Sequence, residues 1–314
     1  MEHLSLARRI YLFIYLVISL ILSLYISSFD CTMMRKFLIR SMAFSLAAII
    51  LLLACEAYYF YSGWYQEKVN GTEVYYALRN SKQKHSKVKR LILGDSVSMQ
   101  LYPCTKTYDD AVSLTCNAAI TVAGFYFLMN NYLKTNIENL PNEVVLLVSP
   151  WTLMNNMNSV LAFHYFQKPF YTQEYRTEYT KSLYETVHNN PYFWLSQFPF
   201  VRSSSYCVDY DVPEKSWYWI APIVSDYVQK MDSLCAAYHI TFRMIPSPVR
   251  IDRKNELENA IFLSIQSRES PILEFPVMKQ YMNYINYADT ILFRDNIHFK
   301  SDMIPQNYIQ RFDQ

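Results

Sequence analysis

The sequence predicts an α/β protein with a parallel sheet, preceded by one or two membrane-spanning helices. Two long apolar runs lie before residue 64. Beyond residue 87, short apolar runs of strand length alternate with segments whose apolar residues recur every three or four positions. Strands that alternate with helices are typical of a parallel sheet with helices on both faces. The strand-like runs also end in clusters of polar residues, which places those clusters at one edge of the sheet.

The composition is that of a protein with a substantial core and little net charge. The chain has 314 residues, of which 52% are hydrophobic and 17% aromatic. This length is sufficient for one large domain or two. The formal net charge is only +2. Proteins that bind nucleic acid usually present a strongly basic face, so this balance argues against a nucleic-acid partner.

The N-terminal end has the pattern of a membrane anchor. Residues 10–29 form an uncharged run long enough to cross a bilayer as a helix, and a second apolar run covers residues 42–61. Arg35, Lys36 and Arg40 lie between the two runs. Because positive residues prefer the cytoplasmic side, we expect the second helix to run outward. The remainder of the chain would then be extracytoplasmic, tethered to the inner or cytoplasmic membrane.

Two alternatives stay open at this end. The sequence that begins at Met33 and Met34 resembles the start of a signal anchor, so residues 1–33 are either a first transmembrane helix or an upstream extension. Residues 34–63 form the anchor in both cases. Cys55 lies in a weak lipoprotein-like context, but residues 58–61 continue the apolar stretch, which favours the membrane anchor.

Between the anchor and the first strand, residues 64–87 are mostly polar and predict a stalk, which leaves residues 88–314 as the α/β domain. Cysteines beyond the anchor are Cys104, Cys116, Cys207 and Cys235. An oxidising compartment permits disulfides, with Cys104 and Cys116 as the first candidate pair, while buried free thiols are the alternative. No spacing typical of a zinc site is present, so we expect neither a metal nor a cofactor.

The first half of the domain contains three strand-like runs. The apolar run at 88–93 ends in Gly94 and predicts a buried strand. A second short strand is expected at 115–120, followed by a helix at 124–132, where apolar residues recur at helical spacing. The uninterrupted apolar run at 143–148 is the clearest buried strand of the chain.

The second half begins with an insertion. Residues 151–217 show no clean period, which predicts loops and short helices. Their aromatic residues are candidates for facing a substrate, although core packing is favoured for most of them: Tyr165, Phe166, Tyr171, Tyr175, Trp194 and Tyr206. An amphipathic helix is expected at 223–238, a strand at 239–245 and a last strand at 290–293.

Polar residues at the predicted strand ends suggest a catalytic centre. Ser96 follows the first strand, whereas Asp295 and His298 follow the last. A serine hydroxyl is a poor nucleophile until a base takes its proton, and that base needs a partner that fixes its tautomer. Taken singly, these residues are more typical of a turn, a helix cap and a surface histidine. Together they match a serine, histidine and aspartate triad, whereas a metal site would lack further ligands.

Leu-Gly-Asp-Ser after the first strand and Asp-x-x-His near the C-terminus resemble the SGNH, or GDSL-type, hydrolase family. The resemblance covers residues 88–314. It implies a three-layer, flavodoxin-like fold and activity on esters, often acyl groups on carbohydrates. It also implies that Ser96 is the nucleophile, His298 the base and Asp295 its orienting acid. The oxyanion would be held by the Ser96 N–H and by an N–H of the 117–124 segment, with Val122 and Gly124 as the backbone candidates.

The sequence departs from the family pattern in two places. The Gly-x-Asn-Asp block, whose Asn is an oxyanion donor, is replaced by Ser149-Pro150-Trp151-Thr152. Loss of one such donor costs about a hundredfold to a thousandfold in rate. The glycine of the second block has no counterpart near Asn117 unless Gly124 serves.

The Ser-Pro sequence is similar to that of membrane-anchored relatives that handle acyl groups on envelope polymers, such as the D-alanyl-teichoic-acid transfer proteins. We therefore expect an esterase or O-acyltransferase acting on a cell-envelope polysaccharide. Candidate substrate-binding residues are Asn117, Ser149, Trp151 and Arg250. The expected partners are the membrane, an acylated glycan or other ester, and envelope-assembly proteins. The alternative is a degenerate member that binds a glycan or an assembly partner without chemistry.

Overall fold

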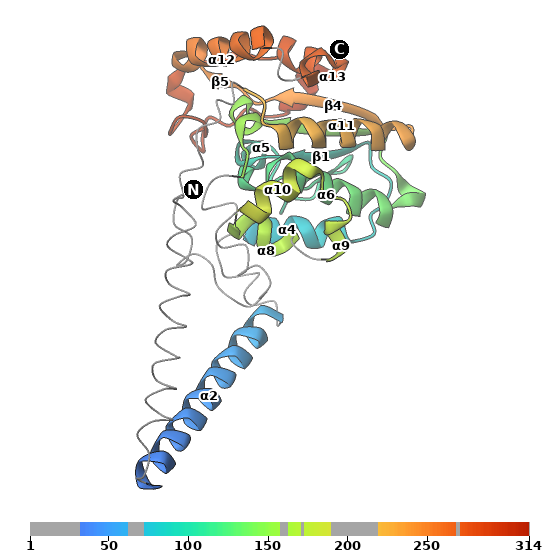
Figure 1. Cartoon of the computed structure of the whole chain (residues 1–314). Coiled ribbons are helices and arrows are strands. Elements are labelled where there is room, and N and C mark those ends of the chain that lie inside the picture. The colour runs from blue at the N-terminus through green and yellow to red at the C-terminus, as the bar shows by residue number, and fades with distance from the viewer. Residues whose placement is uncertain are drawn as a thin grey trace. The chain divides into compact units, whose positions relative to one another are not determined.

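The computed structural model describes residues 32–61, 72–157, 163–170, 173–189, 219–267 and 271–313. The chain divides into two compact units, Met1–Trp64 and Tyr65–Gln314. Figure 1 shows both units and labels many of their helices and strands.

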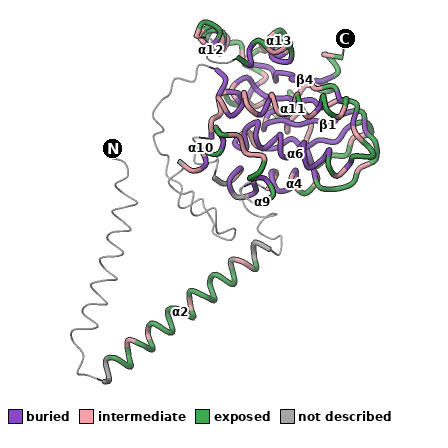
Figure 2. The backbone as a smooth tube through the Cα atoms, turned by 45° about the vertical axis from the view of Figure 1, so that its right-hand side comes forward, coloured by how far each residue is buried: buried purple, intermediate pink, exposed green. Residues whose placement is uncertain are grey.

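The first unit contains one long described helix, α2 (Thr32–Tyr61). Its segment Arg35–Cys55 is long and apolar enough to cross a membrane, and the apolar side chains along it are exposed (Figure 2). At a rise of about 1.5 Å per residue, a helix of this length matches a hydrocarbon core of about 30 Å. Within the predicted anchor at 34–63, residues 34–61 are therefore helical. The apolar run at 10–29 lies outside the described residues.

The second unit is built on a parallel sheet of four strands in the order β2-β1-β3-β4. These strands are β1 (Arg90–Gly94), β2 (Ala111–Ser113), β3 (Glu143–Val148) and β4 (Thr241–Pro246). Leu91 lies opposite Val112 on one side and Val144 on the other. The predicted α/β class with a parallel sheet is confirmed.

Side chains of β1 and β3 alternate between the two faces of this sheet. Leu91, Leu93, Val144 and Leu146 belong to the larger core, which includes α6 (Thr121–Thr135) and α11 (Pro222–Ala237). These two helices pack against each other along the sheet (Figure 1). On the opposite face, Ile92 and Val145 pack with Tyr308 and Ile309 of the C-terminal segment η9 (Tyr308–Phe312).

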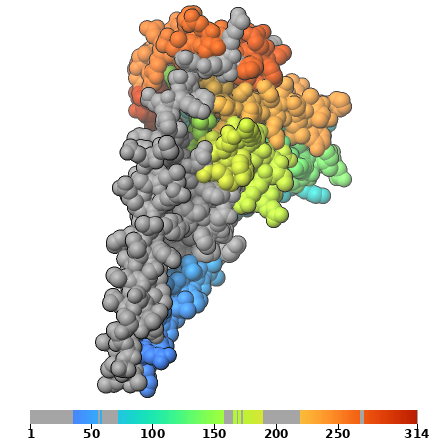
Figure 3. Space-filling view, in the orientation of Figure 1, coloured from blue at the N-terminus to red at the C-terminus, as the bar shows by residue number. Residues whose placement is uncertain are grey.

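Most of the remaining elements are short. They are α4 (Thr72–Ser81), α5 (Ser96–Leu101), η1 (Ala118–Ile120), η2 (Ile137–Asn139), η3 (Pro150–Met154), η4 (Phe163–Gln167), α8 (Lys168–Phe170), α9 (Gln173–Arg176), α10 (Lys181–Asn189), β5 (Val249–Arg250), η6 (Ile251–Arg253), α12 (Lys254–Ser267), η7 (Pro271–Glu274), α13 (Pro276–Asn283), β6 (Tyr287–Ala288) and η8 (Thr290–Leu292). The outer sides of α11 and α12 form part of the molecular surface (Figure 3).

Three expectations about these elements were wrong. Residues 72–81, expected within a stalk, form α4, whose Val74 and Ala77 are buried in the core. The second strand lies at β2, before the expected 115–120, and part of that range is η1. Residues 290–292 form η8, because the Asp289 carboxylate accepts the Ile291 N–H and caps a turn there. The strand that precedes the acid and base is instead β6, which pairs with β5 in a separate two-stranded sheet.

The cysteines and the aromatic residues of the insertion lie mainly in the core. Cys104, Cys116 and Cys235 are buried free thiols, as the alternative to a disulfide predicted, and Cys207 lies outside the described residues. Phe166 and Tyr175 are buried, and Tyr165 packs against the same core. Tyr171, Trp194 and Tyr206 lie outside the described residues.

Candidate active site

The turn between β1 and α5 brings Ser96 to the carboxyl edge of the sheet. Gly94 ends β1 where the backbone of β3 passes very close. A Cβ atom there would collide with the Leu147 carbonyl oxygen and would lie 2.5 Å from Ser98 Cβ. Only glycine fits, because one of the colliding atoms belongs to the backbone and cannot rotate away.

Asp95 holds this turn in place and is itself buried, with 1% of its surface exposed. One carboxylate oxygen caps α5 by accepting the N–H groups of Val97 and Ser98, each at 3.1 Å. The other oxygen accepts the Ser149 N–H at 2.6 Å and the Thr152 hydroxyl at 2.5 Å. A buried carboxylate is stable only when its lone pairs are satisfied, and here they join the ends of β1 and β3. Asp95 is therefore a structural residue, a role that its sequence position alone did not reveal.

Ser96, His298 and Asp295 lie in hydrogen-bonding contact. Ser96 Oγ is 2.8 Å from His298 Nε2, although the two residues are 202 positions apart. His298 Nδ1 lies 3.0 Å and 3.1 Å from the two carboxylate oxygens of Asp295. A proton on Nδ1 directed at the carboxylate leaves Nε2 free to accept the serine proton. The structure thus brings together the three residues that the sequence assigned to the triad.

The environment of Asp295 keeps this carboxyl group ionised. Partial burial by itself raises its pKa, but the N–H groups of His298 and Ile297, together with the His298 ring, outweigh burial and lower the pKa to about 2. These backbone bonds are 2.8 Å for His298 and 2.9 Å for Ile297. A carboxylate that stays charged can orient the imidazole and stabilise the imidazolium that forms when the ring takes a proton.

The segment that carries Asp295 and His298, residues 293–299, forms a tight hairpin, here called the acid-base loop. Phe293 and Phe299 form an antiparallel bridge, and the Arg294 N–H donates to the His298 carbonyl at 2.9 Å. Arg250, at the end of β5, donates to the Asp295 carbonyl at 2.9 Å and to Asn296 Oδ1 at 3.2 Å. The same guanidinium makes two bonds to the Asp252 carboxylate. Arg250 was expected to bind substrate, whereas in the structure its donors hold this loop.

The predicted oxyanion donors lie at two helix beginnings. Ser96 is the first residue of α5, and its N–H is outside the Asp95 cap. Val122 and Gly124 lie in the buried first turn of α6. At Gly124 a Cβ would approach the Ile120 side chain to 2.6 Å, so helix packing explains this glycine. Among the described residues, no hydrogen bond joins Ser96 to Val122 or Gly124.

The residue of this segment with glycine-like geometry is Thr121. Its φ of 54° and ψ of −177° fall in a region that L residues rarely occupy. Its hydroxyl accepts the Ala123 N–H at 3.1 Å, which caps α6. The sequence offered no signal for this conformation, because a β-branched residue is the least expected type at a positive φ.

Of the other predicted substrate-binding residues, two are used by the fold. Asn117 Oδ1 accepts the Ala119 N–H at 2.9 Å and caps η1. Ser149 is buried, and its hydroxyl accepts the Trp151 N–H at 3.4 Å. Trp151 remains partly exposed, with the Arg253 guanidinium 4.7 Å from its ring centroid. Trp151 is thus the one of the four whose side chain is partly open and outside these hydrogen bonds.

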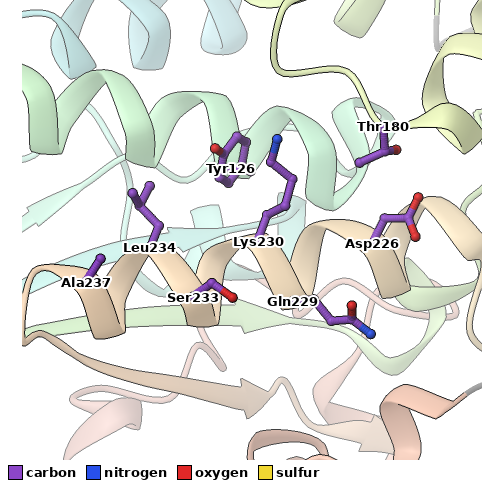
Figure 4. Close-up of a pocket in the computed structure, with 8 residues that line it drawn as sticks. All are labelled: Tyr126, Thr180, Asp226, Gln229, Lys230, Ser233, Leu234 and Ala237. Atoms are coloured by element: carbon purple, nitrogen blue, oxygen red, sulfur yellow. The ribbon is translucent and has the colours of Figure 1, made fainter.

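A groove of about 610 Å³ lies away from the triad, between α6 and α11 (Figure 4). Lys230 points toward Tyr126 within it and donates to Glu178 Oε2 at 3.0 Å. The Tyr126 hydroxyl donates to the same carboxylate oxygen at 3.0 Å. None of the triad residues lines this groove. Among the described residues, no group of three or more His, Cys, Asp or Glu side chains is arranged to hold a metal ion.

A scan against protein-family models and searches of curated proteins and of solved structures found no match for this chain. The roles considered for Ser96, Asp295 and His298 therefore rest on their motifs and on the distances between them.

Proposed function

We propose that the chain is a membrane-tethered serine esterase or O-acyltransferase that acts on acyl esters of a cell-envelope polysaccharide. The contact of 2.8 Å between Ser96 Oγ and His298 Nε2, with Asp295 behind the ring, is the observation that carries the proposal. Nucleophile, base and orienting acid at hydrogen-bond distance are the arrangement that acyl transfer through serine requires. An SGNH-like, flavodoxin-type fold for residues 88–314 is part of the same proposal.

In the proposed reaction, Ser96 Oγ attacks the ester carbonyl carbon while His298 Nε2 takes the hydroxyl proton. Asp295 stabilises the imidazolium that results. The negative charge on the carbonyl oxygen would be met by the Ser96 N–H and by a donor at the beginning of α6. The bond to the alcohol then breaks, His298 protonates the leaving oxygen, and an acyl group remains on Ser96. Water or a sugar hydroxyl, deprotonated by His298, then attacks the acyl carbon. The bond to Ser96 Oγ breaks, His298 returns the proton to Oγ, and the free acid or the new ester leaves.

The membrane setting narrows the proposed substrate. The segment Arg35–Cys55 of α2 is able to cross a bilayer, and it begins with Arg35, Lys36 and Arg40. Because such residues favour the cytoplasmic side, the catalytic unit would lie outside the cytoplasm. A tethered enzyme in that position meets envelope polymers, and their O-acyl groups are esters of the kind that a serine triad cleaves. Envelope-assembly proteins are proposed as further partners.

A fluorophosphonate probe tests the proposal on the full chain in detergent. We expect covalent labelling of the wild type and no labelling of Ser96→Ala or His298→Ala. Ser233→Ala, which changes an exposed serine on α11, is the matched control and should be labelled like the wild type. If the wild type is folded and the probe can reach Ser96, absence of labelling would contradict an enzymatic function.

One observation favours a second candidate, a protein that binds a glycan or an assembly partner without chemistry. Asn155, which follows η3, donates to the Ala118 carbonyl at 2.8 Å and accepts the Met157 N–H at 2.9 Å. Its amide oxygen and one of its two N–H donors are therefore engaged in the fold, and no hydrogen bond joins Asn155 to Ser96 among the described residues. Glycan binding that persists in Ser96→Ala, without ester turnover by either protein, would select this candidate.

A further inference from the structure

The side chain of Gln100 joins the nucleophile helix to the acid-base loop. Gln100 lies on α5, four residues after Ser96. Its Nε2 donates to the Phe299 carbonyl at 3.1 Å, and its Oε1 accepts the Phe299 N–H at 3.0 Å. Phe299 directly follows His298 in the chain. A single carboxamide thus satisfies both backbone groups of the residue next to the base.

The two hydrogen bonds of the planar Gln100 carboxamide fix the orientation of Phe299 as well as its distance. One hydrogen bond would let the loop pivot, whereas a donor and an acceptor held in one plane also set the orientation of the Phe299 peptide groups. Residues four apart on a helix lie on the same face, so Gln100 and Ser96 present their side chains in the same direction. The helix backbone thus links Ser96 to Gln100, the carboxamide links Gln100 to Phe299, and Phe299 is bonded to His298 in the chain. The hydrogen bond between His298 and Ser96 closes the ring.

Apolar packing also joins α5 to the acid-base loop. Val97 of α5 packs with Phe293 and Phe299, and all three side chains are almost fully buried. The two rings lie with their centroids 4.9 Å apart. Arg250 contacts the loop at other positions, the Asp295 carbonyl and Asn296. Arg250 thus holds the loop to β5, whereas the Gln100 carboxamide holds it to the helix that carries Ser96.

We infer that Gln100 is a positioning residue, which sets the His298 imidazole at hydrogen-bond distance from Ser96 through its paired bonds to Phe299. The inference rests on the proposed function, because positioning matters for rate only if Ser96 is the nucleophile. A base displaced by about 1 Å can cost on the order of a hundredfold in rate. Gln100 touches no reacting atom and acts through His298.

The kinetic test uses the full chain in detergent and measures both the rate constant and the stoichiometry of fluorophosphonate labelling. We expect Gln100→Ala to lower the rate constant on the order of a hundredfold while the fraction of reactive protein stays the same. Gln100→Glu keeps the acceptor for the Phe299 N–H and loses the donor, so its rate should lie between the two. Gln266→Ala, which changes an exposed glutamine on α12, should match the wild type.

A lower labelled fraction with an unchanged rate constant would overturn the inference, because that result describes a purely structural role. If Gln100→Ala does not fold, the labelling rate constant and the labelled fraction of Gln100→Glu test the inference instead. A labelling rate of Gln100→Glu equal to that of the wild type would then overturn the inference.

A second measurement does not depend on turnover. The chain contains six histidines, so ring-labelled histidine gives few NMR signals, and His298 is assigned by its loss in His298→Gln. We expect Ser96→Ala to shift the His298 signal when Gln100 is present and to leave it unshifted in Gln100→Ala. An equal shift in both backgrounds would refute positioning by Gln100. An unlabelled wild type that still shows the Gln100-dependent shift would refute the proposed function alone.

Discussion

Asp95 and Ser96 are neighbours in the sequence, but the fold gives them different tasks. Asp95 is buried and accepts hydrogen bonds from N–H groups of α5 and from Ser149 and Thr152, which follow β3. Ser96 is only partly buried, and its hydroxyl faces His298. Gly94 makes this division feasible, because its lack of a Cβ lets the turn lie against the Leu147 carbonyl. The turn is thus specified by packing and by the buried carboxylate before any chemistry is considered.

We predict that Asp95→Asn lowers the free energy of unfolding by about 3 kcal/mol, because an amide presents a donor where the carboxylate accepted from Ser149 or Thr152. Urea unfolding of the detergent-solubilised chain measures the change. Asp109→Asn, at an exposed aspartate, serves as the control and should change stability by no more than about 0.5 kcal/mol. Equal stability of the two variants would show that the Asp95 network does not hold the turn.

Asp295 gives a pH-dependent prediction. Its folded pKa is lowered from 3.8 to about 2, so its ionised form stabilises the fold. That contribution is fully present above the pKa of the unfolded state, near 3.9, and is lost as the pH falls from there toward the folded value. We expect the difference in melting temperature between wild type and Asp295→Asn to shrink as the pH falls from about 4 toward 2. A difference that grows on acidification would contradict the lowered pKa.

At the scale of elements, sequence reasoning succeeded where the pattern was strong. Residues 143–148 form β3 with the predicted bounds, because a continuous apolar run has few alternatives once both of its faces are buried. α11 also follows its periodicity. β2 and β6 have three and two residues, too few to produce a period, and their places are set by pairing with distant strands.

The candidate site was predictable only in part. A serine, an aspartate and a histidine that follow predicted strands have few shared roles other than a triad, so Ser96, Asp295 and His298 could be proposed from the sequence. Gln100 and Arg250 carry none by type, because glutamine and arginine are ordinary surface residues. Their contacts span 199 and 45 positions and exist only once the chain is folded. The sequence therefore predicted the three proposed reacting groups but not the groups that hold them.

The β5–β6 sheet and Arg250 form the second support of the acid-base loop. We predict that Arg250→Gln lowers the fluorophosphonate labelling rate on the order of tenfold, because the loop loses its bonds at the Asp295 carbonyl. Arg253→Gln is the matched control, since the Arg253 guanidinium contacts Glu256 and Trp151. Labelling rates that fall equally in both variants would argue for a general effect of charge.

At the scale of the whole molecule, the C-terminal segment closes the sheet face opposite α6 and α11. Arg90 of β1 and Arg243 of β4 both pair with Asp313. Burial by itself raises the pKa of Asp313, but these two guanidinium groups outweigh it and lower the pKa. Tyr308, almost fully buried, donates its hydroxyl to the Pro246 carbonyl at 2.8 Å. The described residues that form the core of the second unit thus lie within residues 72–313.

This closure leads to a prediction about the anchor. The sheet, its covering helices and the triad all belong to the unit Tyr65–Gln314, whereas α2 belongs to the other unit. We expect a chain that begins at residue 65 to fold without detergent and to keep its labelling rate within about twofold of the full chain, since each domain carries its own core. The full chain should stay with membranes after alkaline extraction. Loss of the cooperative unfolding transition in the shortened chain, while the full chain retains it, would mean that α2 contributes to the fold of the catalytic unit.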